Sequence, residues 1–169
     1  MSSRLYWKKW CQFEQKDAKN AKILGIFVKA MHPKFEHANE LSRRVIGAAI
    51  EVHKLKGPGL LESIYEKCLM RELFLQGIPA QQQVVVPIEY KGFTFDEPMN
   101  LDVFVDDCLI LELKAVTEVL PIHKAQLLSY MRLMDIPLGL LINFHEMQLV
   151  KGVHRLILPG ADSSNERKA

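Results

Sequence analysis

Hydrophobic and polar positions along the chain predict two helices ahead of a series of strands. Apolar residues recur at steps of three and four over Glu36–Leu55 and again over Leu60–Gln76, as on one face of a helix. Lys56-Gly57-Pro58-Gly59 ends the first segment and Gly77-Ile78-Pro79 ends the second, and both sequences break helices. We interpret His53, near the end of the first helix, as a surface or cap residue.

Short apolar and β-branched segments separated by turn signals follow these helices. Strands are predicted over Gln83–Tyr90, Phe93–Glu97, Met99–Val105 and Cys108–Val116. Lys91-Gly92 predicts a hairpin turn, and Asp106-Asp107 a second one. The residues from Phe93 to Val105 fit one bent strand equally well.

The last part of the pattern predicts one more helix and two more strands. The helix covers Ile122–Met134 after Pro121, and the apolar run Leu138–Phe144 is typical of a central strand. An edge position for that run would instead favour dimerisation. A short strand over Val153–Leu158 completes the order. With Phe93–Val105 counted as one bent strand, this order is two helices, three strands, one helix and two strands. The sequence thus predicts an α/β fold with a mixed central sheet flanked by helices.

Length and composition fit one ordinary globular domain. The chain has 169 residues, nearly half of them hydrophobic, and no apolar run approaches the ~18 residues of a membrane span. No signal peptide is recognisable. Cys11, Cys68 and Cys108 are scattered, so neither a disulfide framework nor a structural zinc site is indicated. A cytoplasmic location is therefore expected.

Charge divides the chain unevenly. Residues 1–30 hold seven Lys/Arg and two acidic residues, whereas the remainder holds fifteen basic and eighteen acidic residues. Basic residues interleaved with aromatics can bind nucleic acid or an anionic membrane surface, or simply form a loosely docked extension. Met31, followed by His-Pro, is an alternative start. We expect a basic, aromatic extension over 1–30, a domain over 31–159 and a polar tail over 160–169.

Candidate chemistry concentrates between Asn100 and Lys114. Side chains alternate along a strand, so Glu112 and Lys114 point the same way. If Asp106-Asp107 is a hairpin tip, Asp102 lies on the neighbouring strand within reach of Glu112. Two carboxylates and an amine would then meet, which suits a divalent cation and a phosphate. A solvated, half-exposed strand face is the alternative interpretation.

Four further candidate residues form two pairs, each on one face of a predicted helix. Glu62 and Tyr65 are three apart on the second helix, and Gln126 and Tyr130 are four apart on the third. Glu62 also fits a first-turn carboxylate favoured by the helix dipole. Gly59, just before the second helix, would let another backbone approach closely.

These residues together resemble the PD-(D/E)XK nuclease superfamily and, within it, the GxxExxY family. The name-giving motif stands at Gly59–Tyr65, and the superfamily signature is matched by Asp102 and by Glu112-Leu113-Lys114. Gln126–Tyr130 is similar to the QxxxY motif of the exonuclease-like branch. The resemblance covers roughly Met31 to Pro159 and implies a restriction-endonuclease-like core.

The resemblance also implies a catalytic apparatus. Asp102 and Glu112 would hold one or two Mg²⁺ (or Mn²⁺) ions, with the Leu113 carbonyl completing the shell. Lys114 would orient the attacking water or stabilise charge on the phosphate, and Glu62 would be a further ligand, directly or through water.

The remaining motif residues would support this chemistry. Gln126 and Tyr130 would position the substrate backbone or the waters around the site. Gly59 would serve packing, and Tyr65 would be either a core residue that supports the site or a contact. The implied activity is metal-dependent hydrolysis of phosphodiester bonds in nucleic acid, which is expected to be DNA. A second copy of the chain or another protein would be needed to surround a duplex. The alternative is a catalytically silent module of the same fold that binds nucleic acid or a protein. A zinc enzyme or a nucleophilic enzyme is disfavoured, because no His/Cys cluster or nucleophile elbow is present.

Overall fold

The computed structural model describes residues 31–95 and 99–162, which belong to a unit spanning residues 31–165. The helices are α2 (Phe35–Lys56), α3 (Glu62–Leu75) and α4 (Pro121–Met134), with a short 3-10 helix η1 (Leu149–Gly152). The strands are β1 (Ala80–Val86), β2 (Glu89–Tyr90), β3 (Phe93–Thr94), β4 (Met99–Val105), β5 (Leu109–Lys114), β6 (Leu138–Asn143) and β7 (Val153–Ile157). Within this described part, no helix combines the length and apolar character needed to cross a bilayer.

The predictions for the extension over residues 1–30, including the alternative start, lie outside the described residues. The polar tail is described only at its beginning. Ala161 is 4% exposed there, and its carbonyl accepts the His32 N–H at 2.9 Å. The chain therefore stays packed into the first residues of the predicted tail.

Five strands form one mixed sheet in the order β1-β4-β5-β6-β7. β5 and β6 are parallel, and the other three pairs are antiparallel. α4 makes the crossover that two parallel strands require. The predicted α/β class and mixed sheet are confirmed, and the strands of this sheet follow the predicted order, with three before α4 and two after it. β6 lies between β5 and β7, so the central position predicted for Leu138–Phe144 is confirmed and the edge position is wrong.

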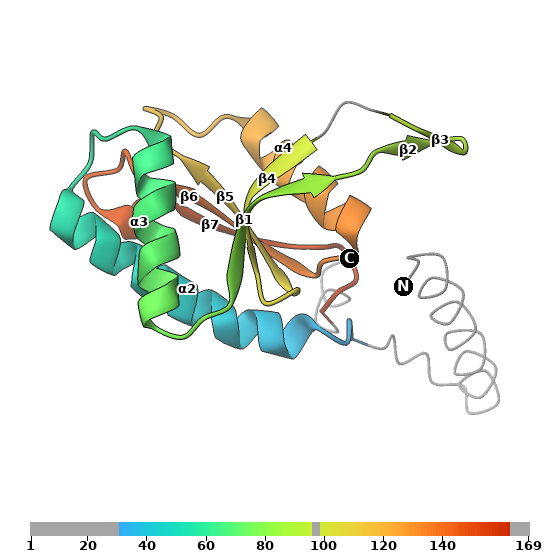
Figure 1. The fold of residues 1–169 in the computed structure, drawn as a ribbon, viewed down its shortest axis with the longest axis horizontal. Helices are drawn as coiled ribbons and strands as arrows, with labels where there is room; N and C mark the ends of the chain where they lie inside the picture. Colours follow the sequence, from blue (N-terminus) through green and yellow to red (C-terminus); the bar gives the residue numbers. More distant parts are fainter. Residues whose placement is uncertain (1–30, 96–98, 163–169) are drawn as a thin grey trace, which may run out of the picture. The chain divides into compact units, whose positions relative to one another are not determined.

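Helices cover both faces of this sheet (Figure 1). Alternate residues of β5 contribute to opposite cores: Leu111 and Leu113 pack in the core with α2 and α3, whereas Ile110 packs in the core with α4. Both faces of β5 and β6 are thus buried, which explains why these strands are continuously apolar. A charged residue within β5 is therefore costly unless it has partners or a ligand.

The strand predicted over Gln83–Tyr90 is split by Pro87. β1 ends at Val86, whereas β2 and β3 form a separate two-stranded sheet that we call the ribbon. A proline cannot donate to a strand ladder, so the pairing is interrupted there. Lys91 and Gly92 make the predicted turn with φ values of 51° and 82°. The single bent strand from Phe93 to Val105 is wrong, because β3 and β4 belong to different sheets.

The β4–β5 hairpin brings the candidate residues together. Asp106 and Asp107 form its tip, with φ values of 44° and 54°, as predicted. Backbone pairing runs from Val105 opposite Leu109 to Val103 opposite Leu111 and then stops. The next positions on the two strands are Asp102 and Glu112, so the carboxylates lie where the strands separate.

Candidate active site

The candidate site lies where β4 begins, β5 ends and α3 starts. Asp102 comes from β4, Glu112 and Lys114 from β5, and Glu62 is the first residue of α3. The Gly57–Leu61 loop turns the chain back from α2, and this turn aims the first residue of α3 at the end of β5. Folding brings these four residues together although Glu62 and Lys114 are 52 positions apart in the sequence.

Asp102 is anchored by the neighbouring strand. Its Oδ2 accepts the backbone N–H of Leu113 at 2.7 Å. This bond forms where β4 no longer offers a backbone carbonyl to β5, so the carboxylate takes the place of a strand acceptor. The second oxygen of Asp102 is left for another ligand.

Glu112 is the most deeply buried charged residue of the site. Only 1% of the residue is exposed. Its Oε1 accepts a bond of 2.7 Å from Lys114 Nζ, whereas its Oε2 is buried without a hydrogen-bond partner. A buried carboxylate oxygen without a partner is destabilising, and it is the kind of atom that a bound cation would satisfy.

The amine of Lys114 lies among the acidic groups. Besides Glu112, Nζ donates to the Leu113 carbonyl at 2.9 Å and lies 3.9 Å from Glu62 Oε1. Leu113 therefore uses both its backbone groups in the site, its N–H toward Asp102 and its carbonyl toward Lys114. Its side chain is buried in the core with α2 and α3.

Burial and mutual repulsion perturb the titration of these groups. Burial, followed by the charge of Asp102, raises the pKa of Glu112 to about 7, against the opposing effect of Lys114. Burial also raises the pKa of Asp102 and of Glu62. Burial alone would lower the pKa of Lys114, but Glu112, Glu62 and Asp102 together raise it. One ammonium group thus serves three carboxyl groups, and the site is short of positive charge.

The donor set fits a hard divalent cation. In the described parts of the chain, no group of three or more His, Cys, Asp and Glu side chains could by itself hold a metal ion. The candidate ligands are two carboxylates and the Leu113 carbonyl, and Mg²⁺ is commonly bound by one or two carboxylates while keeping several waters. Such a cation would give the buried Oε2 of Glu112 the partner that it lacks.

Gln126 and Tyr130 form a hydrogen-bonded pair on α4. Gln126 Nε2 donates to the Tyr130 hydroxyl at 3.3 Å, and that hydroxyl donates to the Asn100 carbonyl at 3.0 Å. Tyr130 is 3% exposed, so it ties α4 to the start of β4, two residues before Asp102. Gln126 is half-buried and bonds to Tyr130, so this pair is linked to the site through the backbone of β4.

Gly59 and Tyr65 shape the loop that precedes Glu62. The close approach expected at Gly59 is wrong, because a Cβ there would meet nothing within 4 Å. The residue instead has φ of 102°, which disfavours other side chains. The buried Tyr65 hydroxyl donates to the Gly57 carbonyl at 2.6 Å and accepts from Leu60 N at 3.1 Å. Its ring stacks on Phe144 with centroids 4.4 Å apart.

Two residues near the site were not identified from the sequence. Asn143, 1% exposed, accepts the Val116 N–H at 3.0 Å and donates to its carbonyl at 2.7 Å, which fixes the chain after β5. A polar residue at the end of an otherwise apolar strand was the available signal. His123 accepts the Leu120 N–H at 3.2 Å through Nδ1 and, when charged, lowers the pKa of Glu62.

His53 was predicted to be a surface or cap residue, and the surface alternative is wrong. It is 8% exposed and its Nε2 lies 2.8 Å from the Glu146 carbonyl oxygen, so it joins the end of α2 to the loop after β6. Such a contact depends on tertiary packing, which the helical period does not indicate.

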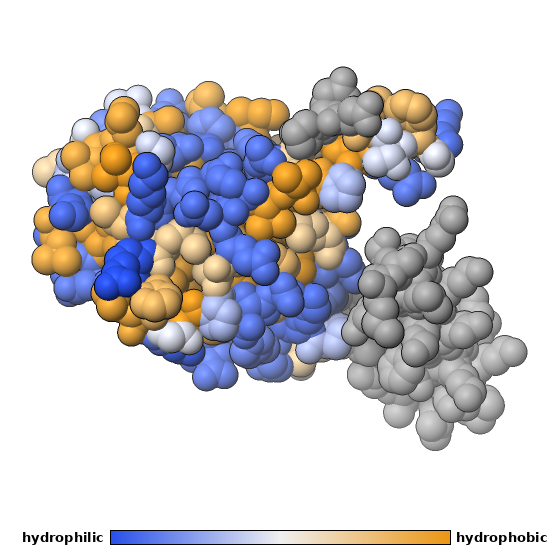
Figure 2. Space-filling model, in the orientation of Figure 1, coloured by the Kyte–Doolittle hydropathy of each residue, from blue (hydrophilic) through white to orange (hydrophobic). Residues whose placement is uncertain are grey.

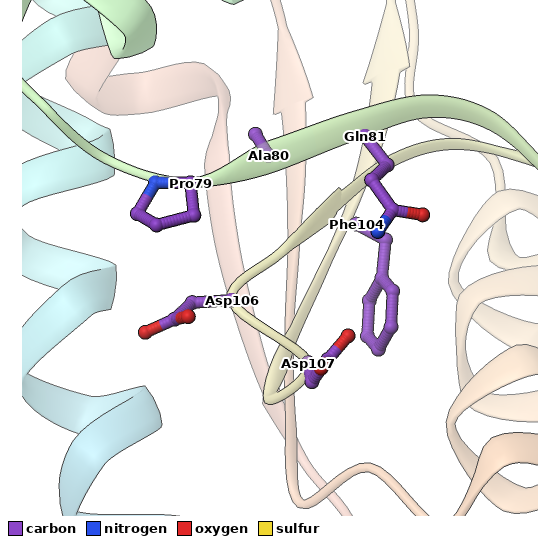
Figure 3. A pocket seen from close by; sticks show the side chains of 6 residues that line it. All are labelled: Pro79, Ala80, Gln81, Phe104, Asp106 and Asp107. Atoms are coloured by element: carbon purple, nitrogen blue, oxygen red, sulfur yellow. The ribbon is translucent and has the colours of Figure 1, made fainter.

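A pocket lies at the other end of β4, by the hairpin tip (Figure 3). It has a volume of about 270 Å³ and is lined by Pro79, Ala80, Gln81, Phe104, Asp106 and Asp107. Asp106 points toward α2, where its Oδ2 lies 2.7 Å from His37 Nε2. None of the residues of the candidate active site lines this pocket.

The chain was compared with known families, curated proteins and solved structures. The family model described as the PD-(D/E)XK nuclease superfamily matches residues 39–156. This range runs from within α2 into β7 and includes all the acidic residues of the site and Lys114. No curated protein and no solved structure matches the chain.

Proposed function

The chain belongs to the PD-(D/E)XK nuclease superfamily, and from this premise we propose that it hydrolyses phosphodiester bonds of DNA with the help of Mg²⁺ or Mn²⁺. The observation that carries this proposal is the buried Oε2 of Glu112, which has no hydrogen-bond partner. A second carboxylate, that of Asp102, lies on the neighbouring strand. A structural ion pair would have left both oxygens satisfied.

Each residue has a separate task in this proposal. Asp102 and Glu112 would hold the cation, with the Leu113 carbonyl as a third oxygen, and Glu62 would add a ligand directly or through water. When bound, the cation supplies a water of lowered pKa and offsets the negative charge of the phosphate. The bond from Leu113 N keeps Asp102 in place before the cation arrives.

Lys114 would act on the phosphate. Its ammonium group has three N–H donors, of which one binds Glu112 and one the Leu113 carbonyl. The third makes no hydrogen bond within the described part of the chain, although Nζ lies 3.9 Å from Glu62 Oε1. This N–H could therefore meet a phosphate oxygen, where it would stabilise the charge that develops as the P–O bond breaks. A cation bound to Glu112 and Glu62 would weaken their attraction for the Lys114 amine, and the amine could then contact the substrate.

The supporting residues would fix the geometry. Tyr65 would hold the loop that delivers Glu62, and Gln126 with Tyr130 would hold the start of β4 and line the path of the substrate backbone. We also propose that the chain is a GxxExxY protein, on the motif at Gly59–Tyr65, that it acts in the cytoplasm, and that a second copy or a partner protein helps it to embrace a duplex.

A cleavage assay with matched variants tests the proposal. The purified chain is incubated with single-stranded, duplex, branched and RNA substrates in Mg²⁺, Mn²⁺ or EDTA. We expect cleavage of DNA only with the metals, and its loss in Asp102→Asn and Lys114→Ala. Asp107→Asn and Lys151→Ala make the same chemical changes at exposed positions away from the site, and these should cut like the wild type.

Two outcomes would contradict the proposal. Equal cutting by the wild type, Asp102→Asn and Lys114→Ala would show a contaminating nuclease. Metal-independent binding without cleavage of any substrate would instead favour the catalytically silent module.

A further inference from the structure

The ribbon formed by β2 and β3 carries its aromatic rings on one face. Tyr90 and Phe93 are directly paired across the strands, and Phe95 lies two residues beyond Phe93. Paired residues share a face, as do residues two apart in a strand, so all three rings lie on the same side. Phe93 and Phe95 contact each other edge to face, with centroids 5.3 Å apart.

These three rings, which we call the aromatic face, are exposed. Tyr90 is 61% exposed, Phe93 65% and Phe95 41%. Figure 2 shows hydrophobic and hydrophilic residues side by side on the ribbon, at the upper right. An isolated two-stranded ribbon is only marginally stable in water, and exposed apolar patches usually mark a binding surface. The aromatic face therefore requires a partner.

The ribbon extends from the end of the sheet that holds the candidate active site. The last residue of β1, Val86, pairs with the first residue of β4, Met99, and the ribbon continues from that pair (Figure 1). Asp102 follows three residues along β4, or about 10 Å at the usual rise of a strand. A linear polymer bound across the site would therefore reach the ribbon within a few of its monomers.

The charges of the ribbon favour contact with bases over contact with phosphates. Glu89 and Lys91 balance each other, so the ribbon from Glu89 to Thr94 has no net charge. A duplex presents its phosphates outward and hides the faces of its bases, so this ribbon offers little to a duplex. Unpaired bases expose their faces, and aromatic side chains on β-strands bind such bases by stacking.

Lys91 adds a second feature of the same kind. Its Nζ lies 5.2 Å from the centre of the Tyr90 ring, at the tip of the ribbon. The amine is exposed there, beside the ring on which a base would stack. A ring with a neighbouring cation suits a nucleotide better than it suits an apolar protein surface.

We propose that the aromatic face stacks on unpaired bases of a nucleic acid strand whose backbone passes the candidate active site. This inference rests on the proposed function, because it takes nucleic acid as the substrate. It adds the class of substrate, which is a single strand or a duplex with a single-stranded tail or gap.

Binding measurements test the inference without requiring cleavage. Fluorescence anisotropy is recorded with the full chain in EDTA and in Ca²⁺, on a labelled 20-nucleotide single strand, its duplex, and a strand of the same length that lacks bases at its centre. We expect tighter binding to the intact single strand than to the other two probes. Phe93→Leu and Tyr90→Leu should each weaken single-strand binding by about fivefold or more, the usual effect of losing one stacking ring.

Conservative variants separate a stacking role from a structural one. Tyr90→Phe and Phe93→Trp keep a ring and should bind like the wild type. Leu133→Ala removes a half-exposed apolar side chain from α4 and serves as the control for general surface effects. Circular dichroism of every variant shows whether the fold is kept.

The results distinguish this inference from the proposed function. Equal single-strand binding by the wild type and the two Leu variants would overturn the inference, even if the chain cuts DNA. Ring-dependent binding without cleavage would support the inference while the proposed hydrolysis fails. A change of mass in sedimentation equilibrium with unchanged binding would overturn it and make the ribbon a self-association arm.

Discussion

Asp102 and Leu113 are joined by a hydrogen bond of 2.7 Å from the Leu113 backbone N–H to the Asp102 carboxylate. The bond spans β4 and β5 at the point where their ladder ends. It gives Asp102 a structural role besides the proposed metal-binding one, so the two roles must be separated by the choice of substitution.

Asp102→Asn and Asp102→Ala should differ in stability. Asparagine keeps an oxygen that can accept the Leu113 N–H, so its free energy of unfolding should stay within about 1 kcal/mol of wild type. Alanine leaves that N–H without its acceptor, which costs about 1–3 kcal/mol. Urea unfolding followed by circular dichroism measures both values. Equal stability of the two variants would mean that water replaces the bond.

Glu112 should make the metal-free protein less stable as pH rises. The pKa of Glu112 is about 7 in the folded state and has a usual value of 4.5, so between these values the folded state holds a proton that the unfolded state has lost. The contribution of Glu112 is therefore complete below pH 4.5 and is lost as pH rises through 7. The loss is on the order of 3 kcal/mol.

The comparison that isolates this effect is Glu112→Gln, which cannot ionise. The free energy of unfolding of both proteins is measured in urea with EDTA from pH 4.5 to 8. The lowered pKa values of His32 and His154 make the folded protein more stable as pH rises, but this effect is the same in both proteins and cancels in the comparison. The difference in free energy of unfolding, wild type minus variant, should fall with pH. A difference that stays constant would show that Glu112 titrates at its ordinary pKa.

Binding of Mg²⁺ should reverse this loss. The cation needs Glu112 ionised, so its apparent affinity should rise with pH up to about 7 and then level off. Thermal unfolding at pH 5.5 and pH 8, with and without Mg²⁺, should show a larger increase in Tm at pH 8. Glu112→Gln and Asp102→Asn should show little increase at either pH, whereas a full increase in both variants would place the cation elsewhere.

The fold could be predicted further than the site. Period and turn residues were sufficient for β4, whose predicted ends, Met99 and Val105, are the observed ones, because its alternation and its flanking turns are local. The split at Pro87 was missed, although proline is a local signal, because the β-branched run continued past it. The separate ribbon depends on which strands pair, and that is decided by tertiary contacts.

All the motif residues of the site were named from the sequence, but the contacts that fix their positions were not. The spacing of Glu112 and Lys114 indicated a shared face, and a resemblance supplied Glu62. Neither could indicate that Asp102 bonds to a backbone N–H, or that Asn143 fixes the chain after β5. These contacts join positions that the chain brings together only on folding.

Tyr65→Phe should lower stability and, more strongly, activity. The ring and its stacking on Phe144 are kept, but the Gly57 carbonyl and the Leu60 N–H lose their partner. We expect a loss of about 1–2 kcal/mol in the free energy of unfolding. Because this loop delivers Glu62, cleavage should fall at temperatures where the variant is still folded. Ser42→Ala is the control, because it removes a buried hydroxyl that bonds to the Asn39 carbonyl within α2, and it should lower stability without a separate loss of cleavage.

Gly152→Ala should be more damaging than Gly139→Ala. A Cβ on Gly152 would lie 2.4 Å from the Asn143 carbonyl oxygen, a backbone atom that cannot move without shifting β6. A Cβ on Gly139 would meet the Met131 and Leu127 side chains at 2.8 and 2.9 Å, and flexible side chains can repack. We expect a loss of about 1–3 kcal/mol for Gly139→Ala and a larger one for Gly152→Ala.

Because Asn143 also binds Val116 after β5, Gly152→Ala should weaken the thermal stabilisation by Mg²⁺, whereas Gly139→Ala should leave it intact. Similar losses from both substitutions would show that the β6–β7 connection yields as readily as the α4 core.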